Sequence, residues 1–234
     1  MRNKILFLFK LNCLFFMCFL IIPSSYAGVS LGATRIIFPS SEKQITLPVN
    51  TNLESDHFLI QSWIENSTGE KDNNFFISPP LFMMEGKKEN NLRIFDKSLT
   101  KLPSDRESLF WINVKAIPSS DKKDMDKNIL QFSVTSKIKM FYRPENLNYP
   151  LSEAPNNLTF KFSPEGLIVK NPTPLFLTLI EISLNNEKLD NVMVPPFEEV
   201  ILSPKQSHAG SGKISFSTIN DYGAKTDEIT KTVN

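Results

Sequence analysis

The chain has 234 residues, and its 26 Lys and Arg nearly balance its 25 Asp and Glu to give a formal net charge of +1. This balance argues against a nucleic-acid partner, because such proteins carry a strong positive excess. The only two histidines, His57 and His208, are far apart in the sequence, so we expect neither a histidine-based catalytic triad nor a metal cluster. We therefore expect a protein that is not an enzyme, with no small-molecule substrate, cofactor or metal.

The first 27 residues predict a secretory signal peptide. Basic residues precede an apolar stretch over residues 11–22, which is too short and too interrupted for a membrane span, and small residues at positions 25 and 27 suit a signal peptidase. Cleavage after Ala27 starts the mature chain at Gly28 and leaves 207 residues, with 23 basic and 25 acidic side chains. Both cysteines lie in the removed segment, so the mature chain forms no disulfide.

The mature length is close to twice that of an immunoglobulin-like β-sandwich of about 100 residues. The chain contains 19 Phe, 16 Pro and only 8 Gly, a composition that suits short strands with proline-marked turns. We expect an all-β fold with two sandwich domains, over residues 28–148 and 149–234. A polar, proline-containing segment over residues 145–157 is expected to link them.

The first half predicts several strands separated by turn signals. The opening strand starts at Gly28 and carries Arg35 ahead of the apolar residues 36–38. Taken alone, Arg35 is best interpreted as a solvated charge at a sheet edge. Further strands are predicted over residues 44–49, 58–65 and 75–84, the last with a break at Ser78-Pro79-Pro80 that suits a cis peptide bond.

Residues 102–118 predict a central strand. Leu109, Trp111 and Asn113 alternate with Phe110, Ile112 and Val114. Because both faces are largely apolar, we expect this strand to be covered on both sides. A polar loop over residues 119–127 leads to the next strand, which we expect to be its antiparallel neighbour.

Residues 128–144 predict an unusually long strand that ends at Pro144. One side carries Leu130, Phe132, Val134, Ile138 and Met140, and the other carries Gln131, Ser133, Thr135, Lys137 and Lys139. This period of two indicates a strand rather than a helix. An exposed edge strand is usually protected against pairing with other chains by a charge, a proline or a bulge, yet no such residue occurs in this strand before Lys137. The strand is therefore either fully covered or available to a partner.

The second half again predicts short strands with turns between them, which favours a second sandwich. The predicted strands cover residues 158–162, 166–171, 175–184, 192–194, 199–202 and 213–220. Because the chain ends soon after Thr226, its last strand is expected to be short or absent.

Five motifs in this order resemble the PapD-like periplasmic chaperones of the chaperone/usher pathway, which assembles bacterial pili. The motifs are residues 102–118, Lys137-Ile-Lys-Met-Phe-Tyr-Arg-Pro144, Asn171-Pro-Thr-Pro174, Val194-Pro-Pro-Phe197 and Asn220-Asp-Tyr-Gly223. The resemblance spans the whole mature chain, and several independent motifs make it specific. It departs from some relatives in lacking a disulfide in the second domain.

The resemblance implies two immunoglobulin-like domains set at an angle, with a cleft that receives a pilus or fimbrial subunit in the periplasm. Such subunits lack the last strand of their own sandwich. The strand from Leu130 to Lys139 would insert into the gap, and Leu130, Phe132 and Val134 would fill the subunit's open groove. The subunit would then be delivered to an outer-membrane usher, without ATP.

The resemblance also assigns two groups of charged residues. Arg35 and Lys139 are expected to hold the subunit's terminal carboxylate at the base of the cleft, which outweighs the solvated-charge interpretation of Arg35. Glu107, Arg143 and Asp221 are expected to form an ion network that fixes the angle between the domains.

Two alternatives come from other classes of protein. A structural pilin or adhesin with the same sandwiches would need a donor extension at its mature N-terminus and usually a cysteine pair, and this chain has neither. A periplasmic hydrolase lacks a catalytic cluster. Within the chaperones we favour the subgroup with a short loop before the long strand, and self-association of the free protein through that strand stays open.

Overall fold

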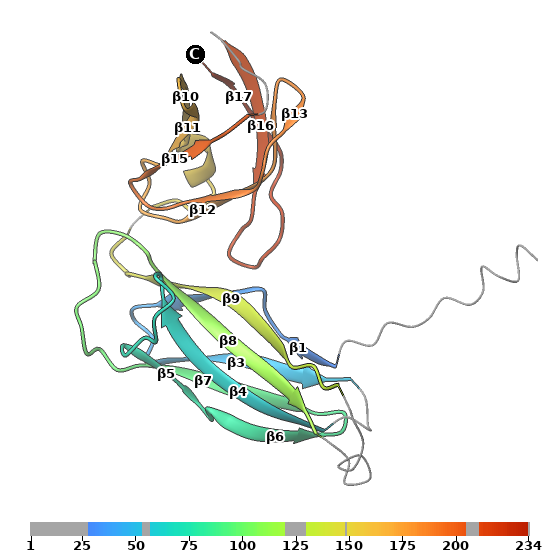
Figure 1. Cartoon of the computed structure of the whole chain (residues 1–234). Helices are drawn as coiled ribbons and strands as arrows, with labels where there is room; N and C mark the ends of the chain where they lie inside the picture. The colour runs from blue at the N-terminus through green and yellow to red at the C-terminus, as the bar shows by residue number, and fades with distance from the viewer. Residues whose placement is uncertain (1–27, 53–56, 120–129, 148, 205–210, 234) are drawn as a thin grey trace, which may run out of the picture.

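The computed structural model describes residues 28–52, 57–119, 130–147, 149–204 and 211–233. The predicted signal peptide, most of the loop that decides between the short-loop and long-loop subgroups, and His208 lie outside these residues. Within them the chain folds into two β-sandwiches, one beyond the end of the other, as Figure 1 shows. This confirms the expected all-β fold.

The first sandwich packs two antiparallel-rich sheets around one hydrophobic core. The first sheet has the order β1 (Val29–Leu31), β3 (Gln44–Thr51), β7 (Glu89–Asp96) and β5 (Phe75–Ser78). The second has the order β2 (Arg35–Pro39), β9 (Val134–Arg143), β8 (Ser108–Pro118), β4 (His57–Asn66) and β6 (Leu81–Glu85). Phe38, Leu47, Ile94, Ile112 and Met140 are fully buried between the sheets.

Strand β8 is central, as predicted, because it pairs antiparallel with β4 on one side and with β9 on the other. Its even-numbered residues Phe110, Ile112 and Val114 enter the core. The break predicted near residue 79 separates β5 from β6 and contains a cis Ser78–Pro79 peptide bond.

The single opening strand predicted from Gly28 is wrong, because the chain forms two strands that belong to different sheets. Strand β1 pairs antiparallel with β3, whereas β2 pairs parallel with β9. Between them the chain crosses from one sheet to the other, and the Gly32 N–H donates to the Pro48 carbonyl at 2.8 Å. A Cβ at Gly32 would lie only 3.0 Å from the Pro48 ring, so glycine suits the crossing.

The long strand also differs from its prediction, because β9 begins at Val134 rather than at residue 128. Residues 128 and 129 lie outside the described part, and residues 130–133 precede the strand. Strand β8 ends at Pro118, which has no N–H to donate, and β2 reaches only as far as Lys139. The Gln131 side chain instead donates to the Pro118 carbonyl.

Three short or polar strands escaped the sequence prediction. The Asn-rich β7 was missed, although Leu92 and Ile94 alternate along it and both are fully buried. The two-residue β13 (Glu187–Lys188) is too short to give a pattern. The last strand, β17 (Ile229–Val233), is present and pairs with β16 along its whole length.

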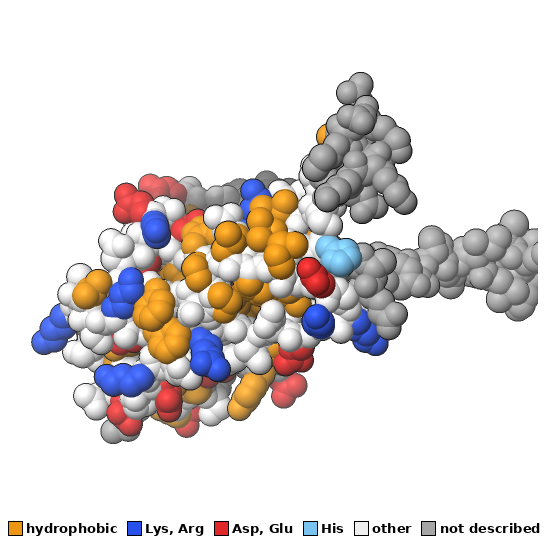
Figure 2. Space-filling model, turned by 90° about the horizontal axis from the view of Figure 1, so that it is seen from below, with side chains coloured by type: hydrophobic (Ala, Val, Ile, Leu, Met, Phe, Trp, Pro, Cys, Tyr) orange, Lys and Arg blue, Asp and Glu red, His pale blue; other side chains and the backbone are white. Residues whose placement is uncertain are grey.

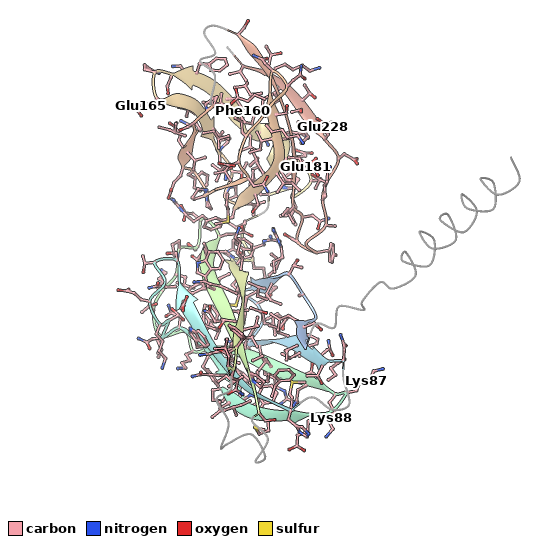
Figure 3. All side chains as sticks on the ribbon, turned by 45° about the vertical axis from the view of Figure 1, so that its right-hand side comes forward. Lys87, Lys88, Phe160, Glu165, Glu181 and Glu228 are labelled. Carbon is pink, nitrogen blue, oxygen red and sulfur yellow. The ribbon has the colours of Figure 1, made fainter. Side chains whose placement is uncertain are left out.

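The second sandwich packs β10 (Thr159–Ser163), β11 (Gly166–Lys170) and β15 (Glu199–Leu202) against a five-stranded sheet. That sheet contains β13, β12 (Leu177–Leu184), β16 (Gly212–Thr218) and β17 in order, with β14 (Val192–Val194) paired to β12. Phe160 contacts Phe216 within its core, at 5.3 Å between ring centroids (Figure 3). Lys87 and Lys88 mark the opposite end of the molecule in the same view.

The segment over residues 145–157 is not a free linker. It contains the 3₁₀ helix η2 (Ala154–Asn157), and Ala154 is fully buried in the second core. Leu147 and Tyr149 pack against the same core. Most of this segment therefore belongs structurally to the second sandwich, because its apolar residues complete that core.

Candidate functional site

The outer edge of β9 is open at its N-terminal end. Strand β8 pairs with β9 from Val134 to Tyr142, whereas β2 pairs with the other edge only from Lys139 to Arg143. Among the described residues, no strand pairs with this outer edge between Val134 and Ile138, a stretch we call the open lane. The open lane therefore offers unpaired backbone N–H and C=O groups to an added strand.

Apolar side chains beside the open lane face solvent. Leu130, Phe132 and Val134 are 81%, 72% and 66% exposed. Farther along the same side, Ile138 packs partly against the core and Met140 is fully buried. The open lane thus combines a free backbone edge with large exposed side chains, and this combination indicates a surface made for a partner.

Two cations, Arg35 and Lys139, lie where the open lane ends. They are direct register partners on the parallel strands β2 and β9, so their side chains leave the same face of the sheet. Arg35 donates from Nη1 to the Ile219 carbonyl at 3.2 Å, and its Nε is buried without a hydrogen-bond partner. Among the described residues, neither cation has a carboxylate within ion-pair distance.

The electrostatic environment of this pair favours an anion. Burial lowers the pKa of Arg35 below its ordinary value, although the charges of Asp221 and Glu107 oppose this effect. Burial also lowers the pKa of Lys139, and the neighbouring positive charge of Arg35 lowers it further. A carboxylate bound between the two side chains would relieve both penalties, because opposite charge favours the ionised form.

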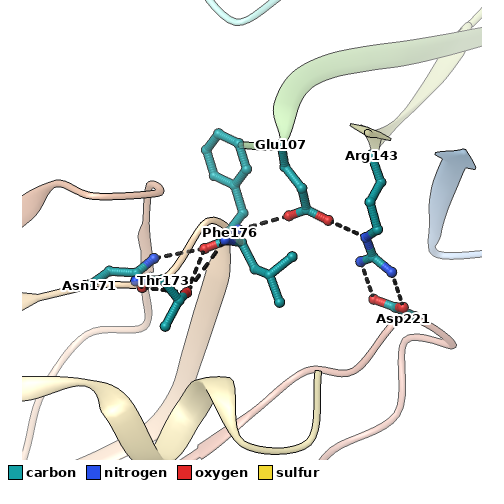
Figure 4. A network of polar contacts seen from close by, with 7 residues as sticks. Glu107, Arg143, Asn171, Thr173, Phe176 and Asp221 are labelled. Carbon is teal, nitrogen blue, oxygen red and sulfur yellow. Dashed lines mark hydrogen bonds and ion pairs between the residues drawn. The ribbon is translucent and has the colours of Figure 1, made fainter. Parts of the chain in front are cut away.

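Glu107, Arg143 and Asp221 come together at the junction of the two domains. Arg143, at the end of β9, donates from Nε to Glu107 Oε1 at 2.7 Å and from Nη1 and Nη2 to Asp221 at 2.7 and 2.8 Å (Figure 4). Hydrogen bonds and charges from both carboxylates raise the pKa of Arg143 above its ordinary value, although its burial acts in the opposite direction. One guanidinium therefore links β8 and β9 of the first domain to the second domain.

The network extends into the second domain through groups that sequence reasoning missed. The Phe176 N–H donates to Glu107 Oε2 at 2.8 Å, and the Glu107 N–H donates to the Pro174 carbonyl at 2.9 Å. Buried Asn171 shapes this turn by donating to the Leu175 carbonyl at 2.7 Å (Figure 4). The Asn171-Pro-Thr-Pro174 motif was the available signal, but backbone donors carry no side-chain signature.

The loop after β16, residues 219–224, forms a hairpin tip that contacts the first domain. Asn220 Oδ1 accepts hydrogen bonds from the N–H groups of residues 222 and 224, at 3.0 and 2.9 Å, which fixes the turn. The tip supplies the Ile219 carbonyl to Arg35 and the Asp221 carboxylate to Arg143. Gly223 has a φ of +81°, and a Cβ there would lie 2.1 Å from Thr34 Oγ1.

The hairpin tip and β2 enclose a hollow of about 340 Å³ between the domains, lined by Arg35, Ile37, Ile45, Asp221 and Tyr222 among others. A separate apolar surface lies on the first domain, where β6 exposes Leu81 and Met83, and the view from below shows hydrophobic side chains gathered on that end (Figure 2). The cation pair is thus set between the domains, away from this surface.

The described residues lack metal-binding clusters and membrane-spanning helices. They contain no group of three His, Cys, Asp or Glu side chains that could hold a metal ion, and none of their helices is long and apolar enough to cross a membrane. His57 is exposed at the start of β4. The site can therefore bind an anion and a strand.

Two family models match the chain and together cover most of it. The "Pili and flagellar-assembly chaperone, PapD N-terminal domain" matches residues 28–148, and the "Pili assembly chaperone PapD, C-terminal domain" matches residues 153–230.

Named relatives agree with this assignment. The chain is 50% identical over 214 residues to the chaperone protein FocC of Escherichia coli, covering 92% of this chain and 94% of that protein. It is 47% identical over 229 residues to the chaperone protein FimC of Escherichia coli K12, covering 97% and 94%.

Solved structures of similar proteins agree with this family assignment. The periplasmic chaperone SfaE has a TM-score of 0.76 at 48% identity, with 87% of this chain and 98% of that chain covered. The SafB chaperone in complex with the SafA pilin, from Salmonella enterica, is matched with a TM-score of 0.79 at 27% identity, over 90% and 98% of the two chains. These matches do not favour the pilin or adhesin alternative. The chain belongs to the PapD-like family of pilus assembly chaperones.

Proposed function

We propose that the protein binds pilus or fimbrial subunits by donating β9 to their incomplete sandwiches and delivers them to an outer-membrane usher. The observation that carries this proposal is an open lane that ends at two cations, neither of which has a carboxylate partner in the described part of the chain. A strand added to the lane gains main-chain hydrogen bonds from an edge that is otherwise exposed to solvent. The hits to named fimbrial chaperones support the same function.

The cations select the direction of the added strand. The lane lies in line with β2, which runs parallel to β9 and begins at Arg35. A strand that enters parallel to β9 would end with its carboxylate beside Arg35 and Lys139. An antiparallel strand would bring its ammonium group, or an uncharged segment, to the same place, where like charges repel. We therefore propose that the subunit strand is parallel and that its terminal carboxylate sets the register.

The exposed apolar side chains would provide shape complementarity to the groove of the subunit. Leu130, Phe132 and Val134 recur every second residue, so they would lie on one face of the added strand pair and enter the groove of a subunit. Burying them would release free energy at about 25 cal/mol per Å² of apolar surface. This source of free energy makes ATP unnecessary.

The ion network is proposed to set the shape of the binding site. Glu107, Arg143 and Asp221 join the domains next to the hairpin tip that contacts Arg35. Their role would be to hold the domain angle, because a buried ion pair adds little net stability over apolar residues but fixes geometry through bidentate contacts, although loss of one partner is costly.

We also propose the compartment and the domain boundary. The relatives support a periplasmic protein, and residues 1–27 would be removed as a signal peptide after Ala27. The mature protein would divide between residues 148 and 149; in support, the first family model ends at residue 148 and the second begins at residue 153. A chaperone of this kind performs no catalysis.

The test is co-purification from the periplasm of cells that produce a subunit, with the wild-type protein and the Arg35→Ala and Lys139→Ala variants. We expect both variants to fold, since neither side chain lies in a core, and to recover at most about one tenth of the subunit, because each loses a charge-assisted contact. Mass spectrometry of the bound material identifies the subunit. Wild-type recovery by both variants would contradict the carboxylate anchor.

A further inference from the structure

Three residues, Trp63, Glu65 and Lys137, form a polar cluster beside the cation pair. Glu65 Oε2 accepts a hydrogen bond from Lys137 Nζ at 2.6 Å, and Oε1 accepts one from Trp63 Nε1 at 2.8 Å. The Glu65 side chain is largely covered, and these contacts, led by the one from Lys137, lower the pKa of its carboxyl group. Glu65 is therefore an ionised carboxylate with both oxygens engaged.

The strand register puts this carboxylate in the same row of the sheet as the anchor lysine. Glu65 on β4 is the partner of Trp111 on β8, and Trp111 is the partner of Lys139 on β9. Two strand spacings put the Cα atoms of Glu65 and Lys139 about 10 Å apart, a distance that extended Glu and Lys side chains can bridge. Glu65 therefore has two lysines in reach and is paired with Lys137.

Both lysines lie over the same indole. Lys137 Nζ is 5.0 Å and Lys139 Nζ is 5.9 Å from the Trp111 ring centre. The Trp111 ring supports each ammonium group by a cation–π contact without neutralising it. Lys137, Lys139 and Glu65 thus lie around Trp111 on one face of the sheet, and the Glu65 carboxylate is paired with Lys137.

Three carboxylates of the described residues that lie around the anchor are engaged by other cations. Glu107 and Asp221 are bound by Arg143, and Glu65 is bound by Lys137. The charged groups around Lys139 on this face are Arg35 on the neighbouring strand β2, Glu65 two strands away on β4, and Lys137 two residues away on its own strand. Among the described residues, Lys139 has no carboxylate within ion-pair distance, and Glu65, the carboxylate in its row of the sheet, is paired with Lys137.

We propose that Lys137 is a positioning residue that holds Glu65 away from Lys139 and so keeps Lys139 free for the carboxylate of a subunit. This inference rests on the proposed function. Without Lys137, Glu65 would turn to Lys139, and an incoming carboxylate would have to displace an internal one. A role in stability is a poor explanation for the pair, because the Lys137 side chain is 43% exposed and such ion pairs contribute little.

The first test follows Lys139 in the free, full-length mature protein. Its pKa is measured by NMR titration of the lysine Cε signals in the wild type, in Lys137→Met, in Glu65→Gln and in the double variant. Methionine keeps an apolar stem over Trp111 but removes the charge. We expect Lys137→Met to raise the pKa of Lys139, because Glu65 becomes its partner, and the added Glu65→Gln change to reverse that rise.

The second test measures selectivity for a carboxylate. The probe is an acetylated peptide of alternating Val and Thr with a free C-terminal carboxylate, compared with its carboxamide form. We expect the wild type to prefer the carboxylate by about tenfold or more, Lys137→Met to lose most of that preference, and the double variant to recover it. Glu65→Gln alone should leave it unchanged, and Lys137→Arg should retain it.

The two proposals fail in different ways. A wild-type protein without preference for the carboxylate would contradict the anchor itself, whereas the titration of Lys139 would still decide the role of Lys137. A wild-type preference that Lys137→Met retains, with an unchanged pKa of Lys139, would overturn the positioning role alone. A loss in Lys137→Met that Glu65→Gln does not reverse would also overturn it, because the loss would then not act through Glu65.

Discussion

The two ends of β9 use the same alternation of residues for opposite purposes. At the C-terminal end, the strand is paired on both edges and Met140 is fully buried. At the N-terminal end, β8 pairs with one edge, the other edge is open, and Val134 is 66% exposed. The difference does not come from side-chain chemistry, which is apolar at both ends. It comes from the lengths of the neighbouring strands, which decide where a partner is present.

This difference shows which apolar surface can still supply free energy for binding a partner. Apolar surface at the C-terminal end is buried when the protein folds, whereas Leu130, Phe132 and Val134 remain exposed in the free protein. Their burial is therefore available to a subsequent association. Arg35 and Lys139 stand at the boundary between the two ends, so the boundary coincides with the anchor that would fix the register of an added strand.

The largest expected effect is at the buried end. Met140→Ala should lower the free energy of unfolding by about 2–5 kcal/mol, because it leaves a cavity in the first core. Urea unfolding of the mature protein measures this loss. Met140→Leu is the matched control and should cost less than about 1.5 kcal/mol, since it conserves volume. Equal, small losses in both variants would mean that the C-terminal end of β9 is not part of the core.

The next effect concerns Arg143, which ends the same strand. Arg143→Ala should destabilise the protein by about 2–3 kcal/mol, because the buried Glu107 carboxylate loses its cation and keeps only the Phe176 N–H. Small-angle scattering should show a broader distribution of domain angles. The control is the double variant with Glu107→Gln, which removes the buried charge and should recover part of the stability. Unchanged scattering and stability in Arg143→Ala would contradict a role in the domain angle.

Much of the architecture could be predicted from the sequence because its signals are local. The alternation within residues 102–118 predicted a central strand, and the structure confirms it as β8. The alternation in residues 128–144 predicted a strand, but its start was wrong by several residues. Alternation records which residues suit a strand, whereas the ladder also requires a neighbour, and no pattern within residues 130–133 shows that Pro118 ends β8 beside them.

The candidate site was predicted in part, for a similar reason. Arg35, Lys139, Glu107, Arg143 and Asp221 carry charges and lie in motifs, so the resemblance could assign them. The contribution of the Phe176 N–H and the Ile219 carbonyl could not be predicted, because every residue has such groups. The pairing of Glu65 with Lys137 could not be predicted either, although Lys137 begins one of the motifs, since the pair crosses β8 and depends on the register of three strands.

A smaller effect is expected for Lys139, which lies at the boundary between the two ends of β9: the affinity for a subunit should depend on pH. Burial and the charge of Arg35 lower the pKa of Lys139. Below this lowered pKa, Lys139 is charged and destabilises the folded protein. This destabilisation is lost as the pH rises above the lowered pKa and Lys139 becomes neutral. A bound carboxylate has the opposite preference and favours charged Lys139. Subunit affinity should therefore weaken in the wild type as pH rises through the lowered pKa of Lys139, which lies below the ordinary lysine value of about 10.4. Isothermal titration should show a flatter profile for Lys139→Ala, and identical profiles would contradict the coupling.

The smallest effect on stability is expected at the open end, where the consequence for binding is large. Replacing Leu130, Phe132 and Val134 together with Thr or Ser should change the free energy of unfolding by less than about 0.5 kcal/mol, because these side chains are exposed in the free protein and contribute little to either core. Subunit recovery from the periplasm should nevertheless fall to background, since the groove of the subunit loses three apolar side chains at once.

Thermal unfolding and recovery are measured on the same preparation, with Thr135→Ser as a control on the opposite side of β9. A large fall in the unfolding midpoint would show that these residues stabilise the free protein, and the two ends of β9 would then serve a single structural purpose. A nearly unchanged midpoint with lost recovery would show instead that the N-terminal end of β9 is reserved for the partner, because only a surface that folding leaves uncovered can lose its apolar side chains without loss of stability.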